Sequence, residues 1–231
     1  MVLAGGFGTR LGELIGHRPK PLAVIHGRPF LDLLIDELVA QQVTRIILCV
    51  GYLREQIISR YRARSDAEFL FSEETVPLGT GGAVRGAAGL VRSDLVLILN
   101  GDSFCKVHFS DFLAFHESKR ADISMVVSDP GGRTDGGSVD VADDGRILRF
   151  VEKSAAVDRT PLINAGIYLM PKSLPTTWTF PAPFSLESDV FPRAAVDGNC
   201  FGFRVNSEVI DIGTPERYRE AQHKPWAGKA S

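Results

Sequence analysis

The segment Leu95-Val96-Leu97-Ile98-Leu99-Asn100-Gly101-Asp102 joins the most hydrophobic run of the chain to a polar turn. A second continuous apolar run, Ile46-Ile47-Leu48-Cys49-Val50, stops at Gly51. Runs that are apolar at every position and are followed by amphipathic stretches are typical of a parallel sheet covered on both faces. We therefore expect an α/β fold with a Rossmann-like, mostly parallel sheet flanked by helices.

Apolar side chains at helical spacing predict a helix over residues 29 to 42, where Phe30, Leu34 and Leu38 form the stripe. After residue 120 the pattern changes, and Asp143-Asp144-Gly145 between two short apolar runs predicts an added β-hairpin. Thr214-Pro215 supplies the cap and the first-turn proline that open a last helix. The other expected elements are helices near 53–62 and 80–90 and after Ser185, and strands near 2–3, 68–71, 123–128, 163–170 and 209–212.

The chain has 231 residues and a formal net charge of −2. A balanced charge favours neither nucleic acid nor an anionic membrane as a partner, and no apolar stretch approaches the ~20 residues of a membrane span. The first residues are too few and too rich in glycine for a secretory signal. Cys49, Cys105 and Cys200 are widely spaced, which predicts unpaired thiols in a reducing cytoplasm. We therefore expect a cytoplasmic protein.

Residues 3–11, Leu-Ala-Gly-Gly-Phe-Gly-Thr-Arg-Leu, form a glycine-rich turn after a short apolar run. The glycines at positions 5, 6 and 8 allow backbone N–H groups to converge on an anion, because no Cβ blocks the approach and positive φ costs little. Arg10 and Lys20 add positive charge on the same side of this turn. The turn therefore predicts a phosphate site.

The spacing of the glycines excludes two common phosphate loops. A P-loop needs Gly, four residues and then Gly-Lys-Ser/Thr, which nothing near Gly5 supplies. The dinucleotide fingerprint begins at Gly6 but has Leu11 where its third glycine belongs. A dinucleotide oxidoreductase also needs an acidic residue after the second strand, where Val50 leads into Gly51-Tyr52. These features disfavour an NAD-type enzyme.

The glycine turn followed by Lys20-Pro21-Leu22 resembles the signature of the sugar-1-phosphate nucleotidylyltransferases, the enzymes that make nucleotide sugars. The resemblance covers residues 2 to about 222. It recurs in the family's order at PLGTGGA (77–83), NGD (100–102), FVEK (150–153), NAG (164–166) and DIGTP (211–215). Because the chain has no repeat or linker, we expect one nucleotidylyltransferase domain over 1–222, with a nucleotide half about 1–110, a sugar half about 111–222 and a tail at 223–231.

In the reaction of this family, an ionised sugar phosphate attacks the α-phosphorus of a nucleoside triphosphate. Repulsion is the obstacle, since two unit charges ~4 Å apart interact by about 4 kcal/mol at an effective dielectric of 20. Mg²⁺ and fixed cations must neutralise this repulsion. The sequence should therefore offer a carboxylate pair for the metal and basic side chains for the phosphates.

Asp102 and Asp211 are the candidate metal ligands. Asp102 follows a fully apolar strand and so lies at the carboxyl edge of the sheet, where ligands bind in open α/β folds; a turn aspartate that caps its own backbone is the alternative. Asp211 sits inside the apolar stretch 209–212, where an unpaired carboxylate is costly. It is therefore either a metal ligand or part of a buried salt bridge. The resemblance matches both with the aspartates that hold Mg²⁺ in the family.

The resemblance also implies the remaining site residues. Arg10 would hold the departing pyrophosphate, Lys20 would touch the phosphates, and Lys153 would neutralise the sugar phosphate. The implied catalytic set is Arg10, Lys20, Asp102, Lys153 and Asp211. The implied nucleotide-binding set is Leu3, Ala4, Gly5, Gly6, Gly8, Thr9, Arg10, Lys20, Leu78, Gly79, Thr80, Gly81 and Asp102. The implied sugar-binding set is Gly101, Glu152, Lys153, Asn164, Gly166 and Glu187.

Within the family, the loop at 77–83 resembles that of guanylyltransferases acting on D-glycero-D-manno-heptose 1-phosphate, which favours GTP and that sugar phosphate as partners. Those enzymes often have Glu directly before the proline, where this chain has Val76. A uridylyltransferase for an amino-sugar or hexose 1-phosphate therefore stays open. A non-catalytic regulator that binds nucleotide sugars is a further alternative, and a homo-oligomer is compatible with the sequence.

Overall fold

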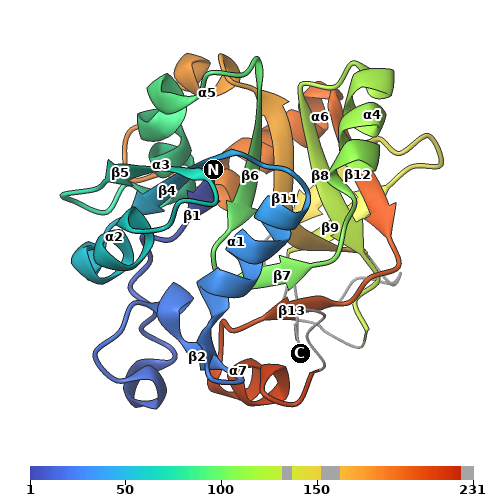
Figure 1. Ribbon diagram of the computed structural model, residues 1–231. Coiled ribbons are helices and arrows are strands. Elements are labelled where there is room, and N and C mark those ends of the chain that lie inside the picture. Colours follow the sequence, from blue (N-terminus) through green and yellow to red (C-terminus); the bar gives the residue numbers. More distant parts are fainter. Residues whose placement is uncertain (132–136, 152–161, 225–231) are drawn as a thin grey trace.

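The computed structural model describes residues 1–131, 137–151 and 162–224. One large sheet holds strands from both halves of the chain, with the order β10-β9-β11-β6-β1-β4-β5, and β8 and β12 continue it beyond β11 (Figure 1). Its strands are β1 (Val2–Leu3), β4 (Arg45–Val50), β5 (Glu68–Glu73), β6 (Leu95–Asn100), β8 (Ile123–Ser128), β9 (Ser138–Val141), β10 (Ile147–Val151), β11 (Leu162–Pro171) and β12 (Cys200–Val205).

The pairing of these strands confirms the expected mostly parallel sheet. β1 lies between β4 and β6 and is parallel to both, β4 is parallel to β5, and β8 is parallel to β12. The antiparallel pairs are those of β11 with β6, β8 and β9, and of β9 with β10. Because β11 is antiparallel to both β6 and β8, these two strands run in the same direction. The carboxyl ends of β1, β4 and β6 therefore meet at one edge of the sheet, where ligands bind in this class of fold.

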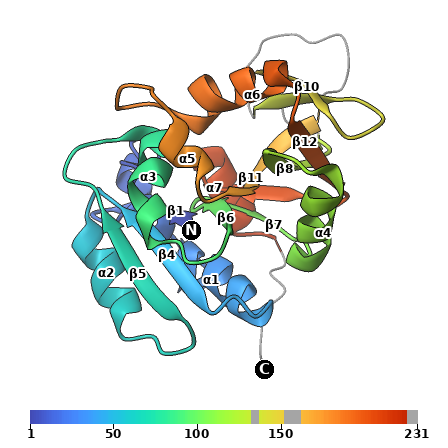
Figure 2. The same ribbon diagram turned by 90° about the horizontal axis from the view of Figure 1, so that it is seen from above.

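Helices cover both faces of the sheet, as the continuous apolar strands predict (Figure 2). Buried side chains of α1, α2 and α4 belong to one apolar cluster, and those of α3 and α6 belong to a second. The helices are α1 (Phe30–Ala40), α2 (Arg54–Arg62), α3 (Gly79–Ala87), α4 (Phe109–Lys119), α5 (Leu174–Thr177), α6 (Phe191–Asp197) and α7 (Pro215–Ala221). Shorter helical turns are η1 (Gly12–Ile15), η2 (Lys20–Leu22), η3 (Ala88–Leu90) and η4 (Leu186–Val190).

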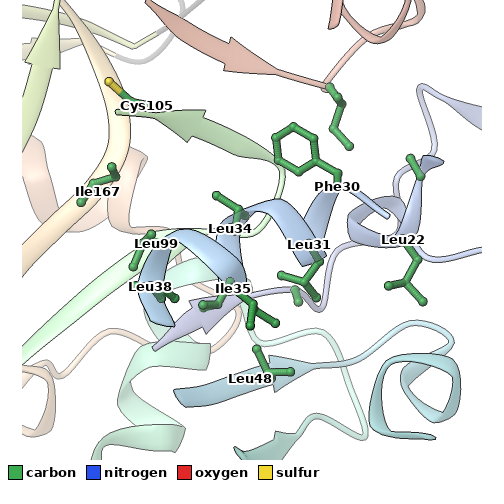
Figure 3. Close-up of a cluster of buried hydrophobic side chains, with 14 of the residues drawn as sticks. Leu22, Phe30, Leu31, Leu34, Ile35, Leu38, Leu48, Leu99, Cys105 and Ile167 are labelled. Carbon is green, nitrogen blue, oxygen red and sulfur yellow. The ribbon is translucent and has the colours of Figure 1, made fainter. Parts of the chain in front are cut away.

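The stripe predicted on α1 is buried against the sheet. Leu38 lies beside Leu99 of β6, and Leu48 of β4 lies on the Ile35 side of the helix (Figure 3). All four of these side chains are less than 4% exposed. Fully burying one such leucine is worth about 1.5–3 kcal/mol, so this helix fixes one layer of the fold.

A second, two-stranded sheet brings distant parts of the chain together. It pairs β7 (Ser103–Cys105) with β13 (Val209–Asp211) in antiparallel fashion, with α7 close by (Figure 1). Sequence patterns did not reveal β7, because three residues are too short to show a period. The predicted start of α7 is confirmed, since the Thr214 hydroxyl accepts a hydrogen bond from the Arg217 N–H at 3.4 Å. A further small hairpin joins β2 (Val24–Ile25) and β3 (Arg28–Pro29).

The predicted hairpin around Asp143-Asp144-Gly145 is also confirmed. β9 and β10 pair in antiparallel fashion on either side of this turn, and β9 joins the large sheet through β11. In the described part of the chain, no helix has the length and apolar character that crossing a membrane requires.

Candidate active site

A cleft of about 780 Å³ opens at the carboxyl ends of β1, β4 and β6. Its walls come from the glycine turn after β1, the segment 74–80, the turn after β6, and the segment around β13. Of the residues predicted from the sequence, those that line the cleft are Leu3, Ala4, Gly5, Gly6, Arg10, Lys20, Gly79, Thr80, Asp102, Asn164, Gly166, Glu187 and Asp211. Gly8, Thr9, Leu78, Gly81 and Gly101 are not among the lining residues, and Glu152 and Lys153 lie outside the described residues.

The glycine turn needs its glycines for close backbone packing. A Cβ on Gly51, at the end of β4, would lie 2.9 Å from the Gly5 carbonyl oxygen. Gly8 has φ +62°, and a Cβ there would lie 2.8 Å from the Lys20 Cβ. Gly6 has no atom within 4 Å of such a position, so its backbone faces open space. The turn therefore presents bare backbone to the cleft while it packs tightly against Lys20, as a phosphate-binding turn requires.

Lys20 is buried and ion-paired. Its side chain is only 11% exposed, and its ammonium group contacts the Asp102 carboxylate. A lysine is almost never buried without such a partner. The pair therefore fixes a positive and a negative group next to each other at the floor of the cleft.

Asp211 is also paired with a cation. The Arg217 Nη1 donates to Asp211 Oδ1 at 2.8 Å and to Oδ2 at 2.7 Å, and the Gly213 N–H donates to Oδ1 at 2.8 Å. The salt bridge, one of the two alternatives for this buried aspartate, is thus present. Arg217 was not predicted from the sequence. The signal for it was a basic residue in the first turn of the helix that follows the β13 strand.

The two acidic residues nevertheless lie in one place. The Ile212 N–H donates to the Asp102 carbonyl oxygen at 3.0 Å, which joins the turn after β6 to the end of β13. A Cβ on Gly213 would lie 3.0 Å from Asp211 Oδ1 and 3.6 Å from Lys20 Nζ. Lys20 therefore has Asp102 as its ion partner and Asp211 close by.

This donor set fits Mg²⁺. Among the described residues, no three His, Cys, Asp or Glu side chains lie close enough together to bind a metal ion. The described side chains therefore do not form a complete set of protein ligands. Mg²⁺ usually binds through one or two carboxylates, together with water and substrate phosphates. The carboxylates of Asp102 and Asp211, which lie on neighbouring segments and line the same cleft, match that pattern.

Glu74 is a cleft residue that the sequence analysis did not select. Its Oε2 accepts a hydrogen bond from the Leu78 N–H at 3.2 Å, and its Oε1 would lie 3.4 Å from a Cβ on Gly5. Burial raises the pKa of the Glu74 carboxyl, and the Leu78 N–H partly offsets this effect. Glu74 follows β5 directly, so its place at a strand end was the signal that could have identified it.

On the opposite wall, Gly166 is a position that only glycine fits. Its φ is +75°, and a Cβ there would lie 2.6 Å from Ser103 Oγ and 3.1 Å from Asn100 Nδ2. The Gly166 N–H donates to Asn164 Oδ1 at 2.9 Å, which orients the Asn164 amide. The predicted pair of Asn164 and Gly166 thus forms one structural unit beside the turn after β6.

Comparison with known proteins adds the family context. A family model described as nucleotidyl transferase matches residues 1–226. The D-glycero-alpha-D-manno-heptose 1-phosphate guanylyltransferase of Aneurinibacillus thermoaerophilus is 31% identical over 223 residues, which are 96% of each chain. A mannose-1-phosphate guanylyltransferase of Mycobacterium tuberculosis is 32% identical over 94% of this chain, which spans only 62% of that longer protein.

Solved structures agree with these matches. The crystal structure of HddC from Yersinia pseudotuberculosis complexed with GMP-PN has a TM-score of 0.82 and 32% identity, with 96% of both chains covered. A putative glucose-1-phosphate thymidylyltransferase from Bacillus anthracis has a TM-score of 0.85 at 16% identity. The second similarity shows the fold alone.

Proposed function

Because the chain belongs to the nucleotidyl transferase family, we propose that it transfers a nucleoside monophosphate from a nucleoside triphosphate to a sugar 1-phosphate and releases pyrophosphate. The observation that carries this proposal is the shared cleft of Asp102, Asp211, Lys20 and Arg10 beside a bare glycine turn. Such a cleft suits a reaction whose main obstacle is the repulsion between anions.

The chain's own residues have distinct tasks in this reaction. The backbone of the glycine turn, with Arg10 and Lys20, binds the triphosphate and holds the departing pyrophosphate. The sugar phosphate is already ionised, so no general base is needed for its attack on the α-phosphorus. Asp102 and Asp211 would hold Mg²⁺, which when bound supplies charge neutralisation at the α-phosphate. Lys20 and Arg217, which pair with Asp102 and Asp211 in the free protein, line the same cleft and would also contact the phosphates of the triphosphate.

We propose GTP as the preferred nucleotide. Guanine presents N1–H and an exocyclic amine as adjacent donors, and a carboxylate accepts from both. Glu74 supports this choice because its carboxylate lines the cleft close to Gly5. Uracil presents one N–H between two carbonyl groups, and those carbonyls would meet the same carboxylate unfavourably. The guanylyltransferases among the similar proteins point the same way.

We propose D-glycero-D-manno-heptose 1-phosphate as the sugar substrate. The relative named for this sugar supports the choice, because it is 31% identical to the chain over 96% of both lengths. The reaction would take place in the cytoplasm, where nucleoside triphosphates are available.

An activity matrix tests the whole proposal. Purified protein is assayed for pyrophosphate release with GTP, UTP, CTP, ATP and dTTP against heptose, mannose, glucose and amino-sugar 1-phosphates, with and without Mg²⁺. We expect the highest kcat/KM for GTP with the heptose, and no release without a divalent ion. Silence across all combinations would refute the proposal, and a maximum with UTP would establish the uridylyltransferase alternative.

The Glu74→Gln variant tests the base assignment. Glutamine keeps the length of the side chain but replaces one acceptor oxygen with a donor. We expect kcat/KM for GTP to fall about 10- to 100-fold, as for the loss of a hydrogen bond to a charged group, while the weak rates with UTP do not fall. Equal losses with both nucleotides would remove Glu74 from base recognition.

A further inference from the structure

The Thr80 hydroxyl, at the start of α3, has both its hydrogen-bonding roles filled within the protein. It donates to Glu187 Oε2 at 2.6 Å, and it accepts from the Leu186 N–H at 2.8 Å. A hydroxyl group has a single proton to donate. The Thr80 proton is therefore directed at Glu187 and away from a nucleotide.

Backbone and side-chain packing attach the same loop to the segment before Glu187. The Gly81 N–H donates to the Phe184 carbonyl at 3.1 Å, and the Phe184 N–H donates to the Leu78 carbonyl at 3.0 Å. Gly79 has φ +74°, and a Cβ there would lie 2.2 Å from the Phe184 oxygen. A Cβ on Gly81 would lie 2.3 Å from the Phe184 ring. The glycines of this loop thus serve its docking onto Phe184.

Glu187 accepts side-chain hydrogen bonds from both segments of this contact. Its Oε2 receives the hydroxyl groups of Thr80 and Ser185, at 2.6 and 2.8 Å. Its Oε1 has the Tyr168 hydroxyl at 3.5 Å, which is the outer limit of a hydrogen bond. Oε1 can therefore accept from a ligand hydroxyl in the cleft that Glu187 lines.

The network continues to the opposite wall of the cleft. The Asn164 Nδ2 donates to the Tyr168 hydroxyl at 2.8 Å, and this hydroxyl lies 3.5 Å from Glu187 Oε1. Asn164 and Glu187 both line the cleft. One chain of hydrogen bonds thus joins the loop of the nucleotide half to a carboxylate and an amide on the other side, and both are suited to sugar hydroxyls.

We propose that Thr80 is a positioning residue for sugar binding: it orients the Glu187 carboxylate as an acceptor for the hydroxyl groups of the sugar 1-phosphate. This proposal rests on the proposed function. It gives the glycine-rich loop at 78–82 a role in sugar affinity, where the family resemblance implies nucleotide binding. If Thr80 serves sugar binding, loss of its hydroxyl raises the KM for the sugar 1-phosphate. If it binds the nucleotide, the same loss raises the KM for the nucleoside triphosphate.

The Thr80→Val variant separates these roles, because valine keeps the shape and removes the hydroxyl. We expect the KM for the sugar 1-phosphate to rise about 10-fold, the loss expected for one hydrogen bond to a charged group. The KM for the nucleoside triphosphate should change less than about twofold, and Thr80→Ser should restore the wild-type values. A rise in the triphosphate KM equal to or larger than that for the sugar would overturn the proposal.

A double-mutant cycle tests whether Thr80 affects the KM for the sugar 1-phosphate through Glu187 or through a general change in structure. Glu187→Gln should raise the same KM, and adding Thr80→Val to it should have little further effect, because Thr80 acts only through that carboxylate. Fully additive effects would contradict the proposal. Thr176→Val is the matched control, since the Thr176 hydroxyl donates to the nearby Ser173 carbonyl and Thr176 is not among the residues that line the cleft. If Thr80→Val does not fold, Thr80→Ala, which also removes the hydroxyl, measures the coupling with Glu187→Gln.

Binding measurements keep this proposal separate from the proposed reaction. Calorimetry compares GDP-mannose, GDP-heptose and UDP-glucose with GDP and UDP. Thr80→Val should weaken the tightest nucleotide sugar about 10-fold and leave its parent diphosphate unchanged. This result stands even if no pyrophosphate is released in the activity matrix. A wild-type protein that binds no nucleotide sugar more tightly than its diphosphate would overturn the inference.

Discussion

The Lys20 ammonium group is buried against the Asp102 carboxylate at the floor of the cleft. A second cation, Arg217, holds the Asp211 carboxylate close by. The protein thus holds two carboxylates and two cations as ion pairs, which spares the buried members the cost of burial alone. The proposed binding of substrate and metal would exchange these partners within a site whose charged groups are already held in place.

The aspartate pair provides the first prediction. Asp102→Asn and Asp211→Asn keep the shape of each side chain but remove the charge that a divalent ion needs. We expect each change to lower kcat/KM at least 100-fold, or about 3 kcal/mol of transition-state stabilisation. Steady-state kinetics over a Mg²⁺ titration measures this loss, and circular dichroism verifies the retained fold. Near-normal turnover of either variant would exclude that residue from the metal site.

The Glu74 carboxyl provides a prediction about pH. Burial raises the pKa of this group above the ordinary 4.5, so Glu74 takes up a proton at a pH where an exposed glutamate is still ionised. Protonated Glu74 cannot accept from both guanine donors, so the KM for GTP should rise as the pH falls through the raised pKa. Glu74→Gln should lack this acidic limb. A pH profile of kcat/KM for GTP is the measurement, and identical profiles for both proteins would argue against the assignment.

The raised pKa of Glu74 also predicts how this residue affects the stability of the fold. An acid whose pKa is higher in the folded state destabilises the fold when it is ionised, above that pKa, and this penalty disappears below the unfolded-state pKa. Glu74→Gln should therefore raise the melting temperature at pH 7 while it lowers turnover with GTP. A lower melting temperature for the variant would show that the ionised carboxylate stabilises the fold.

The glycines that pack on Phe184 give a fourth prediction. Gly79→Ala places a Cβ 2.2 Å from the Phe184 oxygen at a residue with φ +74°, and overpacking together with backbone strain should cost about 2–4 kcal/mol. Gly86→Ala is the matched control in the same helix, where a Cβ would meet only the Leu78 side chain at 3.8 Å. Alanine there should stabilise the protein by about 0.5–1 kcal/mol. Urea denaturation of both variants measures these differences, and similar values would refute the packing argument.

The parts of the fold that follow from local pattern could be predicted. The apolar runs gave β4 and β6, the stripe on Phe30, Leu34 and Leu38 gave α1, and Thr214-Pro215 gave the start of α7. Each of these signals lies within a single element. The position of Asp102 was predictable as well, because a polar residue after a buried parallel strand lies at the carboxyl edge of the sheet.

The partners of the site residues could not be predicted in the same way. Asp211 reaches Asp102 through β7, which has only three residues and pairs with a strand far along the chain. Arg217, Glu74 and the bond between Thr80 and Glu187 likewise depend on contacts between distant segments. The sequence shows which chemical groups the chain carries, but the contacts between distant segments form only in the folded chain.

Asp32 on α1 provides the last prediction, which concerns stability away from the cleft. Its carboxylate is nearly buried and accepts hydrogen bonds from the Arg60 Nε at 3.0 Å and from the Tyr61 hydroxyl at 2.6 Å. Burial alone would raise the pKa of Asp32, but the bonds from Arg60 and Tyr61 outweigh it and lower the pKa. Asp32→Asn should therefore reduce the free energy of unfolding by about 2–3 kcal/mol at pH 7.

Because the folded-state pKa of Asp32 is lowered, this contribution is complete above the unfolded-state pKa of about 3.9 and is lost as the pH falls through the folded-state value. Asp36→Asn is the control, since the Asp36 side chain is 40% exposed in its pairs with Arg28 and Arg64, and pairs of such exposed carboxylates contribute about 1 kcal/mol or less. Urea denaturation from pH 7 down to pH 3 should show the difference between wild type and Asp32→Asn shrinking below about pH 4, and a difference that stayed constant over this range would contradict the assignment.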